Sequence, residues 1–298
     1  MEKRQLGKTD MNVTVLGYGG AEVGFQNESV DTVTRLLNAA LDAGLNAIDT
    51  AECYNASEEL IGKAVSHRRS EYYLFTKCGH ASGIDLPDWD PKLLEQSIDR
   101  SLVRLRTDHV DLLQLHTCSE EKLRQGDVIA AVQKARDAGK ARYIGYSGDS
   151  MAARYAVECG AFDTLQTSVS IADQESIDLT VPLALERQVG VIVKRPIANA
   201  CWRSGGRPEN RYLHLYWDRL QELDYDFLRG DLNESISIAL RFTLSVPGVH
   251  TAIVGTANPD RWQKNADLAR QGPLPVEQFE AVRARWKAVA KPDWIGQA

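Results

Sequence analysis

The feature that most constrains the fold of this chain is a regular alternation of two patterns. Short runs of β-branched and apolar residues recur, and each is followed by a stretch whose apolar residues have helical spacing. Alternation of this kind predicts parallel strands joined by helices. We predict eight strands, at residues Val13–Leu16, Ala47–Asp49, Tyr72–Thr76, Val110–Leu115, Ala141–Tyr146, Thr164–Thr167, Val191–Lys194 and Thr251–Val254.

Eight such units are enough to close a (β/α)8 TIM barrel, and 298 residues suit one barrel of about 250 residues with insertions. We therefore predict a single barrel domain over residues 1–298. An open doubly wound sheet is the alternative, but it needs a GxGxxG loop after the first strand. The sequence there is Gly17-Tyr-Gly-Gly20, which does not provide that loop and favours the barrel.

Several helices are marked by their ends as well as by their apolar stripe. Residues Asp31–Ala43 precede Gly44, Val128–Ala138 precede Gly139, and Pro91–Leu105 begin with proline at the first helical position. A last helix, Val276–Ala290, is predicted as an addition to the barrel. The long connection 198–230 after the seventh strand is rich in aromatic residues, which either cover the barrel mouth or pack the insertion against the barrel.

Composition excludes several classes of protein. A net charge of −6 argues against a nucleic-acid partner, since phosphate binding needs a clustered basic surface. No apolar run approaches the roughly 20 residues needed to cross a bilayer, and the polar N-terminus has no signal-peptide pattern. The five cysteines have no CxxC spacing and are expected to be reduced. We therefore expect a cytoplasmic protein with no membrane partner.

Four polar residues stand at or just after the ends of predicted strands, where barrel active sites lie: Asp49, Tyr54, Lys77 and His116. Reduction of a carbonyl by hydride needs a proton for the developing alkoxide, and a tyrosine can supply it if a nearby ammonium makes its phenol more acidic. Lys77 is suited to that role, Asp49 to pairing with Lys77, and His116 to orienting the carbonyl. Taken singly, each residue also has an ordinary structural explanation as a surface charge or core side chain.

Together, these residues occur in segments that resemble one family. Gly44-Leu-Asn-Ala-Ile-Asp-Thr-Ala-Glu-Cys-Tyr54 resembles the aldo-keto reductase signature, in which a strand ending in Asp-Thr-Ala precedes the catalytic tyrosine. Phe75-Thr-Lys77 and Val110-Asp-Leu-Leu-Gln-Leu-His116 resemble the strands of the catalytic lysine and histidine. The resemblance implies a barrel whose lower end is closed by a hairpin beginning near Leu6, and it extends to about residue 268.

The resemblance also implies a nicotinamide cofactor. Gly139-Lys-Ala-Arg-Tyr-Ile-Gly-Tyr-Ser147 resembles the fifth strand of the family, so that Ser147 and Gln166 would bind the carboxamide and Asp49 the ribose. The segment 254–265 resembles the last strand-to-helix loop, and it places Gly255, Thr256, Arg261 and Asn265 at adenosine or 2'-phosphate positions. A guanidinium and a hydroxyl at a helix N-terminus suit a phosphate, which implies NADP, with NAD as the alternative.

The sequence departs from the family at three places. Gly148 stands where an asparagine commonly contacts nicotinamide, and Lys194 or Arg195 stands where a tyrosine commonly stacks on the nicotinamide ring. An arginine can take over that stacking. Gly255 and Lys264 replace the lysine and glutamate of relatives that prefer NADPH.

The predicted function is reversible reduction of an aldehyde or ketone, a small molecule that is either a sugar or an aromatic carbonyl compound. Trp89 and Trp202 are predicted to bind this substrate, and the protein is expected to be a monomer that needs no metal. One alternative is a regulatory subunit that senses the cofactor with the same barrel. A second is a metal-dependent barrel enzyme that uses Asp49 and His116, although a lysine beside the site would repel a cation.

Overall fold

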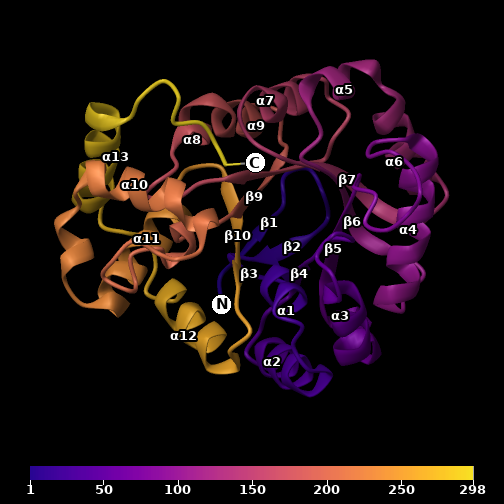
Figure 1. Cartoon of the computed structure of the whole chain (residues 1–298), viewed down its shortest axis with the longest axis horizontal. Coiled ribbons are helices and arrows are strands. Elements are labelled where there is room, and N and C mark those ends of the chain that lie inside the picture. The colour runs from indigo at the N-terminus through magenta and orange to yellow at the C-terminus, as the bar shows by residue number, and fades with distance from the viewer. Residues whose placement is uncertain (298) are drawn as a thin grey trace.

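The computed structural model describes residues 1–297 and contains a closed barrel of eight parallel strands (Figure 1). The strands follow one another around the barrel in chain order, and the last pairs with both the first and the seventh. The predicted (β/α)8 fold is therefore confirmed. The barrel strands are β3 (Leu16–Gly19), β4 (Ala47–Asp49), β5 (Tyr73–Cys78), β6 (Val110–His116), β7 (Ala141–Ser147), β8 (Thr164–Ser168), β9 (Gly190–Lys194) and β10 (Val249–Gly255).

The first barrel strand is the one that we placed wrongly. The predicted strand Val13–Leu16 spans parts of two elements, the hairpin strand β2 (Asn12–Thr14) and the barrel strand β3. Glycine is disfavoured in strands, so Gly17 and Gly19 hid the true strand from a propensity argument. The barrel needs both glycines, because a Cβ added at either would lie 2.6 Å from the side chain of Ile253 on β10.

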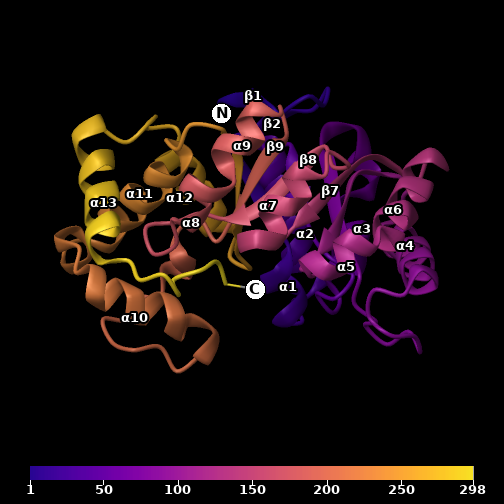
Figure 2. The ribbon, with the colours of Figure 1, turned by 90° about the horizontal axis from the view of Figure 1, so that it is seen from above.

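A two-stranded antiparallel hairpin closes one end of the barrel, as predicted. It consists of β1 (Lys3–Gln5) and β2, and Figure 2 shows it at the end opposite to the C-terminal tail. The hairpin contributes buried apolar side chains to a cluster with residues from the barrel interior. This cluster, called the plug here, consists of Leu6, Met11, Val13, Ala47, Phe75, Leu112, Ile192 and Ile253.

Helices surround the barrel and bury their apolar faces against its outer surface in one continuous core. The predicted helix 91–105 is confirmed with the same bounds, and the other three predicted helices differ by at most one residue at each end. The α-helices are α1 (Ala21–Phe25), α2 (Val30–Asp42), α3 (Ser57–Val65), α4 (Pro91–Leu105), α5 (Glu120–Gln125), α6 (Asp127–Asp137), α7 (Ser150–Glu158), α8 (Glu175–Leu179), α9 (Val181–Glu186), α10 (His214–Leu223), α11 (Leu232–Leu244), α12 (Pro259–Ala269) and α13 (Val276–Val289).

The C-terminal third builds a second apolar cluster beside the barrel, where α10, α11 and α13 lie together (Figure 1). The connection 198–230 contains α10 and three short 3-10 helices, η2 (Ala198–Ala200), η3 (Arg211–Leu213) and η4 (Asp226–Arg229); a fourth, η1 (Ser66–Glu71), follows α3. Trp202 and Tyr216 are buried in this second cluster, which agrees with the packing explanation for the aromatic residues of the insertion. Among the described residues, none of the helices is long and apolar enough to cross a membrane.

Candidate active site

An ion pair lies at the centre of the barrel mouth. Lys77 near the end of β5 and Asp49 at the end of β4 are both almost fully buried, with Lys77 Nζ 2.6 Å from Asp49 Oδ2. The ammonium also donates to the carbonyl of Thr50 at 2.8 Å. Burial alone would lower the pKa of Lys77, but the Asp49 carboxylate, with smaller contributions from Tyr54 and Cys53, outweighs burial and the pKa is raised. The structure therefore has the predicted Asp49–Lys77 pair, with a lysine held charged and fixed in position.

Tyr54 lies beside this ammonium. Lys77 Nζ is 5.0 Å from the centroid of the Tyr54 ring, so the two groups that the sequence analysis joined are close in space. The direction of the pKa shift differs from our expectation, because burial raises the pKa of Tyr54 more than the Lys77 ammonium lowers it. Tyr54 is consequently a neutral phenol in this site. A neutral phenol can donate a proton, and the ammonium is placed to stabilise the phenolate that donation would leave.

His116 completes the group at the end of β6. Its ring meets the Tyr54 ring edge-on, with 5.7 Å between centroids. Burial, assisted by the Lys77 charge, holds the pKa of His116 well below its usual range, so the imidazole is neutral. Cys53 Sγ lies 3.4 Å from His116 Nδ1, and burial raises the pKa of the Cys53 thiol to about 12. A protonated thiol donates to Nδ1, which leaves the proton of the neutral ring on Nε2 as a hydrogen-bond donor.

A row of amides and a hydroxyl extends the buried network away from Lys77. Gln166 and Gln114 both donate to Asp49 Oδ1, at 2.8 Å and 3.2 Å, and Ser147 donates to Gln166 Oε1 at 3.1 Å. Sequence analysis named Ser147 and Gln166 but missed Gln114. The signal was present, because a glutamine inside the apolar run Val110–His116 is unusual in a strand that is buried on both faces.

The predicted adenosine residues lie at the junction of β10 and α12. Thr256 and Asn265 are buried, whereas Gly255 and Arg261 are exposed. Pro259 opens the 11-residue helix α12, whose Asp260 N–H is capped by the side chain of Asn258 and whose N-terminal end has the positive pole of the helix dipole. A hydroxyl, an exposed guanidinium and a helix N-terminus in one place are a donor set that suits a phosphate ester.

The loop after β9 carries a second set of donors. Four of its residues that are not glycine have positive φ, namely Arg195, Ala198, Asn199 and Ala200. Such backbone conformations cost roughly 1 kcal/mol or more each and are concentrated at ligand-binding sites. The Asn199 Nδ2 group is buried without a hydrogen-bond partner in the described residues, as expected of a donor that awaits a ligand. This chain therefore fits a phosphate-bearing nicotinamide cofactor at two neighbouring loops of the mouth, after β9 and after β10.

Lys194 and Arg195 occupy different surroundings. Lys194 Nζ is 2.7 Å from a carboxylate oxygen of Asp149, which is itself buried. The Lys194 ammonium is therefore already paired with a side chain of the same chain. Arg195 donates to the Tyr212 hydroxyl, to Ser168 and to the main-chain carbonyl of Gln297 in the C-terminal tail. Of the two residues predicted to stack on nicotinamide, Arg195 is the one that the structure leaves with contacts that a ligand can replace.

Gly148 has a local structural reason. A Cβ at this position would lie 2.4 Å from the Tyr146 hydroxyl, which donates to the carbonyl of Cys118. The asparagine common in the family would therefore displace Tyr146. The Gly148 main chain instead donates to the carbonyl of Gln166.

The two tryptophans predicted to bind substrate have different surroundings. Trp89 packs on Gly79 and against the ring of His80, which in turn meets His116, so Trp89 belongs to the wall of the mouth. The structure does not bring Trp202 into this group: its indole N–H donates to Ser235 inside the second apolar cluster. The sequence analysis missed Phe25, whose ring centroid is 5.5 Å from that of Tyr54.

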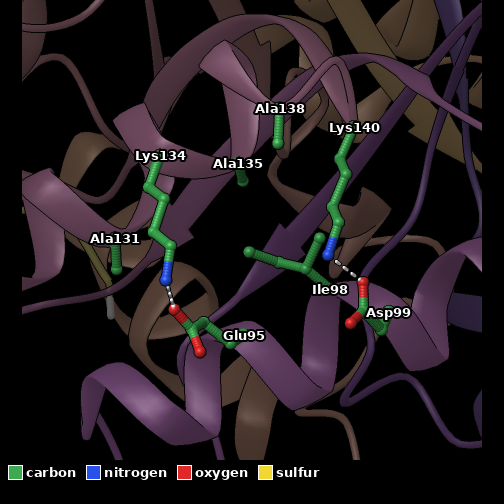
Figure 3. A pocket seen from close by; sticks show the side chains of 8 residues that line it. All are labelled: Glu95, Ile98, Asp99, Ala131, Lys134, Ala135, Ala138 and Lys140. Atoms are coloured by element: carbon green, nitrogen blue, oxygen red, sulfur yellow. Dashed lines mark hydrogen bonds and ion pairs between the residues drawn. The ribbon is translucent and has the colours of Figure 1, made fainter.

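A groove on the outside of the barrel is a separate feature. It lies between α4 and α6, and Figure 3 shows the ion pairs Lys134–Glu95 and Lys140–Asp99 crossing it. Three of these side chains lie on α4 and α6 and Lys140 lies in the turn after α6, and the groove includes none of the residues around Tyr54. Exposed ion pairs of this kind contribute little to stability.

The structure also bears on the metal-dependent alternative. Both carboxylate oxygens of Asp49 already accept hydrogen bonds from Lys77, Gln114 and Gln166, which leaves Asp49 unsuited to a cation. Glu52, Cys53 and His116 do offer atoms within 4.8 Å of one another. Cys53 and His116 are, however, hydrogen-bonded to each other, and the nearby ammonium opposes a cation.

Comparisons with known proteins agree with this geometry. The family model described as "Aldo/keto reductase family" matches residues 15–287, so the chain belongs to the aldo-keto reductase family. It is thus an NAD(P)-dependent oxidoreductase. The chain is similar to the solved structure of an aldo-keto reductase, AKR11C1 from Bacillus halodurans, in a holo form, with a TM-score of 0.80, 28% identity and 99% of both chains covered.

Two curated relatives match over most of their length. The chain is 26% identical to the uncharacterized oxidoreductase YqkF of Bacillus subtilis, with 96% of this chain and 97% of the relative covered. It is 27% identical to L-galactose dehydrogenase of Arabidopsis thaliana, with 89% of this chain and 87% of the relative covered.

Proposed function

We propose that this protein reduces an aldehyde or ketone to an alcohol, reversibly, with Tyr54 as the proton donor. The observation that carries the proposal is the buried Asp49–Lys77 pair with its ammonium 5.0 Å from the ring of a neutral Tyr54. When bound, the cofactor supplies the hydride. The chain supplies the proton from Tyr54 Oη and the charge of Lys77, which stabilises the phenolate as it forms. His116 orients the carbonyl by donating from Nε2.

For the cofactor we propose NADPH, with Ser147, Gln166 and Asp49 at the nicotinamide and ribose and with Thr256, Arg261 and Asn265 at the adenosine end. The exposed Arg261 beside the N-terminus of α12 supports a 2'-phosphate. NADH is the competing candidate, and fluorescence titration with each cofactor separates the two. Tighter binding of NADH than of NADPH would overturn the assignment.

A monomeric, cytoplasmic enzyme with a small-molecule substrate completes the proposal. The cysteines are free, which suits a reducing compartment. The relation to L-galactose dehydrogenase supports a sugar as readily as an aromatic carbonyl compound, and the exposed Phe25 and the half-buried Trp89 would serve either.

The decisive experiment is the substitution Tyr54→Phe. It removes one oxygen atom and should lower kcat for aldehyde reduction by roughly 10²- to 10⁴-fold, the contribution usual for a positioned general acid. Cofactor binding should stay within about twofold, because Tyr54 is not among the proposed cofactor contacts. Tyr143→Phe, which removes a hydroxyl that contacts the Asp10 main chain, is the matched control. Wild-type kcat in Tyr54→Phe would remove Tyr54 from the reaction.

The same assay separates the enzyme from a cofactor-sensing subunit. An enzyme oxidises many equivalents of NADPH when given a panel of aldehydes. A sensor forms a stable complex with NADPH and shows no turnover with any of them.

A further inference from the structure

A second histidine stands at the mouth of the barrel beside His116. His80 lies in the loop between β5 and α4, and the centroids of the two imidazole rings are 5.3 Å apart. Its side chain is 31% exposed, so a molecule that reaches His116 also reaches His80. His80 has no role in the reaction proposed above.

His80 is held in place from four sides. Its Nδ1 is 3.1 Å from Asp88 Oδ2, and the other oxygen of Asp88 accepts from the Ala81 main chain. Its Nε2 is 3.3 Å from Thr117 Oγ1, its main-chain N–H donates to Glu52, and its ring packs on Trp89. A partly exposed side chain gains little stability from being fixed so firmly, whereas a ligand-binding group gains preorganisation.

The backbone around His80 is strained at two of its partners. Trp89 has φ 67° and Thr117 has φ 61°, a conformation that bulky and β-branched residues rarely adopt. The Trp89 ring lies so close to Gly79 that a Cβ there would be 1.9 Å from it. Strain of this kind is concentrated at functional sites, and Thr117, one of the two strained residues, directly follows His116 in the chain.

The walls of the mouth differ in chemistry on the two sides of Tyr54. On one side Phe25, which is 56% exposed, presents an aromatic surface. On the other side His80 and Thr117 present a ring nitrogen and a hydroxyl, separated by a distance at the long end of the hydrogen-bond range. The Thr117 hydroxyl donates its proton to the carbonyl of His116 at 2.6 Å, so towards the mouth it presents an acceptor.

We propose that His80 and Thr117 form a subsite for a hydroxyl group on the carbon next to the reacting carbonyl, and that this subsite sets the preference of the enzyme. The Asp88 carboxylate accepts from His80 Nδ1, which leaves Nε2 of a neutral ring as an acceptor like Thr117 Oγ1, so a substrate hydroxyl binds here by donating its proton to one of these two atoms. The carboxylate of Asp88 behind His80 disfavours an acidic group there and favours a neutral one. The substrate class is then a 2-hydroxyaldehyde or 2-hydroxyketone, which includes open-chain sugars. This inference rests on the proposed carbonyl reduction.

The test compares two aldehydes that differ by one hydroxyl, propanal and 2-hydroxypropanal, at equal concentrations of free aldehyde. The ratio of kcat/KM for 2-hydroxypropanal to kcat/KM for propanal should be at least about 10 in the wild type. A ratio of this size corresponds to the contribution of about one hydrogen bond. The ratio should fall about tenfold in His80→Leu and in Thr117→Val. The use of a ratio removes any general loss of activity that either substitution causes.

The control is His109→Leu. His109 also pairs with an aspartate, Asp108, but on the surface at the opposite end of β6, and its substitution should leave the ratio unchanged. A wild-type ratio near one, or a ratio that His80→Leu and Thr117→Val both leave intact, would overturn the subsite while the carbonyl reduction stands. Failure to turn over either aldehyde, or any other carbonyl compound, would overturn the proposed function and the subsite with it.

Discussion

The two ends of the barrel interior differ by a shift of two residues along the same strands. On β4, β5 and β6 the plug residues Ala47, Phe75 and Leu112 are followed two positions later by Asp49, Lys77 and Gln114. Residues two apart on a strand point to the same face, so both sets face the interior. The first set packs against the hairpin, and the second forms the polar network of the mouth.

The apolar end of the barrel interior serves stability, and the polar end serves chemistry. The plug is an apolar cluster whose burial stabilises the fold. The network at the mouth buries charges, whose desolvation offsets most of the attraction between them. The plug is therefore explained by stability, and the polar layer is explained by what Lys77, Asp49 and Tyr54 do together.

The largest effect that separates the two ends is expected for Lys77→Met. It should lower kcat about 10²- to 10⁴-fold, because the phenolate of Tyr54 would form without its ammonium. It should also lower the free energy of unfolding by about 3–5 kcal/mol, since the buried Asp49 carboxylate loses its cation. Steady-state kinetics and urea unfolding measure the two effects on the same sample.

The control for that variant is Lys63→Met on α3. Lys63 is an exposed lysine that pairs with Glu59. Its substitution should change kcat by less than twofold and the free energy of unfolding by at most about 1 kcal/mol. Equal kcat values for Lys77→Met and Lys63→Met would show that the mouth network has no catalytic role.

The opposite result is expected at the plug. Met11→Ala should lower the free energy of unfolding by about 2–5 kcal/mol, since Met11 is fully buried against the barrel interior. At a temperature well below the unfolding midpoint its kcat should equal that of the wild type. Val276→Ala, at a position 76% exposed on α13, is the matched apolar control and should have almost no effect. A fall in kcat without a fall in stability would mean that the two ends are coupled.

Sequence pattern predicted the barrel because alternation is repeated eight times and survives one local error. The error occurred at β3, where Gly17 and Gly19 leave room for the Ile253 side chain, which a Cβ at either position would clash with. That contact joins positions more than 230 residues apart, and no local rule contains it. Helix ends were predicted within one residue where a proline or glycine marks them, as at Pro91 and Gly44.

The sequence pattern placed the candidate site residues that end strands, whereas contacts made by loops depend on packing that the pattern does not contain. Asp49, Lys77 and His116 follow from strand ends alone, because parallel strands bring their carboxyl ends together. Cys53 and His80 contact His116 through loops whose course depends on positive φ values at nearby residues. The sign of the Tyr54 pKa shift was also missed, since burial depends on packing that the sequence does not show.

The effect expected within a single pH unit is the smallest, and it is confined to the mouth. Burial, with a contribution from Glu58, raises the pKa of Glu52 to about 8, from an ordinary value near 4.5. The folded protein therefore keeps this proton over a pH range in which the unfolded chain loses it. Glu52 contributes its full stability below the unfolded pKa, and that contribution is lost as pH rises through the folded pKa.

Glu52→Gln should remove this dependence while keeping an acceptor for the His80 N–H. Between pH 5 and pH 8 the free energy of unfolding of the variant, relative to that of the wild type, should rise by about 1 kcal/mol per pH unit, as measured by urea unfolding. Met11→Ala should leave the pH slope of the wild type unchanged, because the plug contains no titratable group among its eight residues. A pH slope altered equally by Glu52→Gln and Met11→Ala would contradict the division of the barrel into an apolar end and a titrating end, since Glu52 lies beside His80 at the mouth and is not part of the plug.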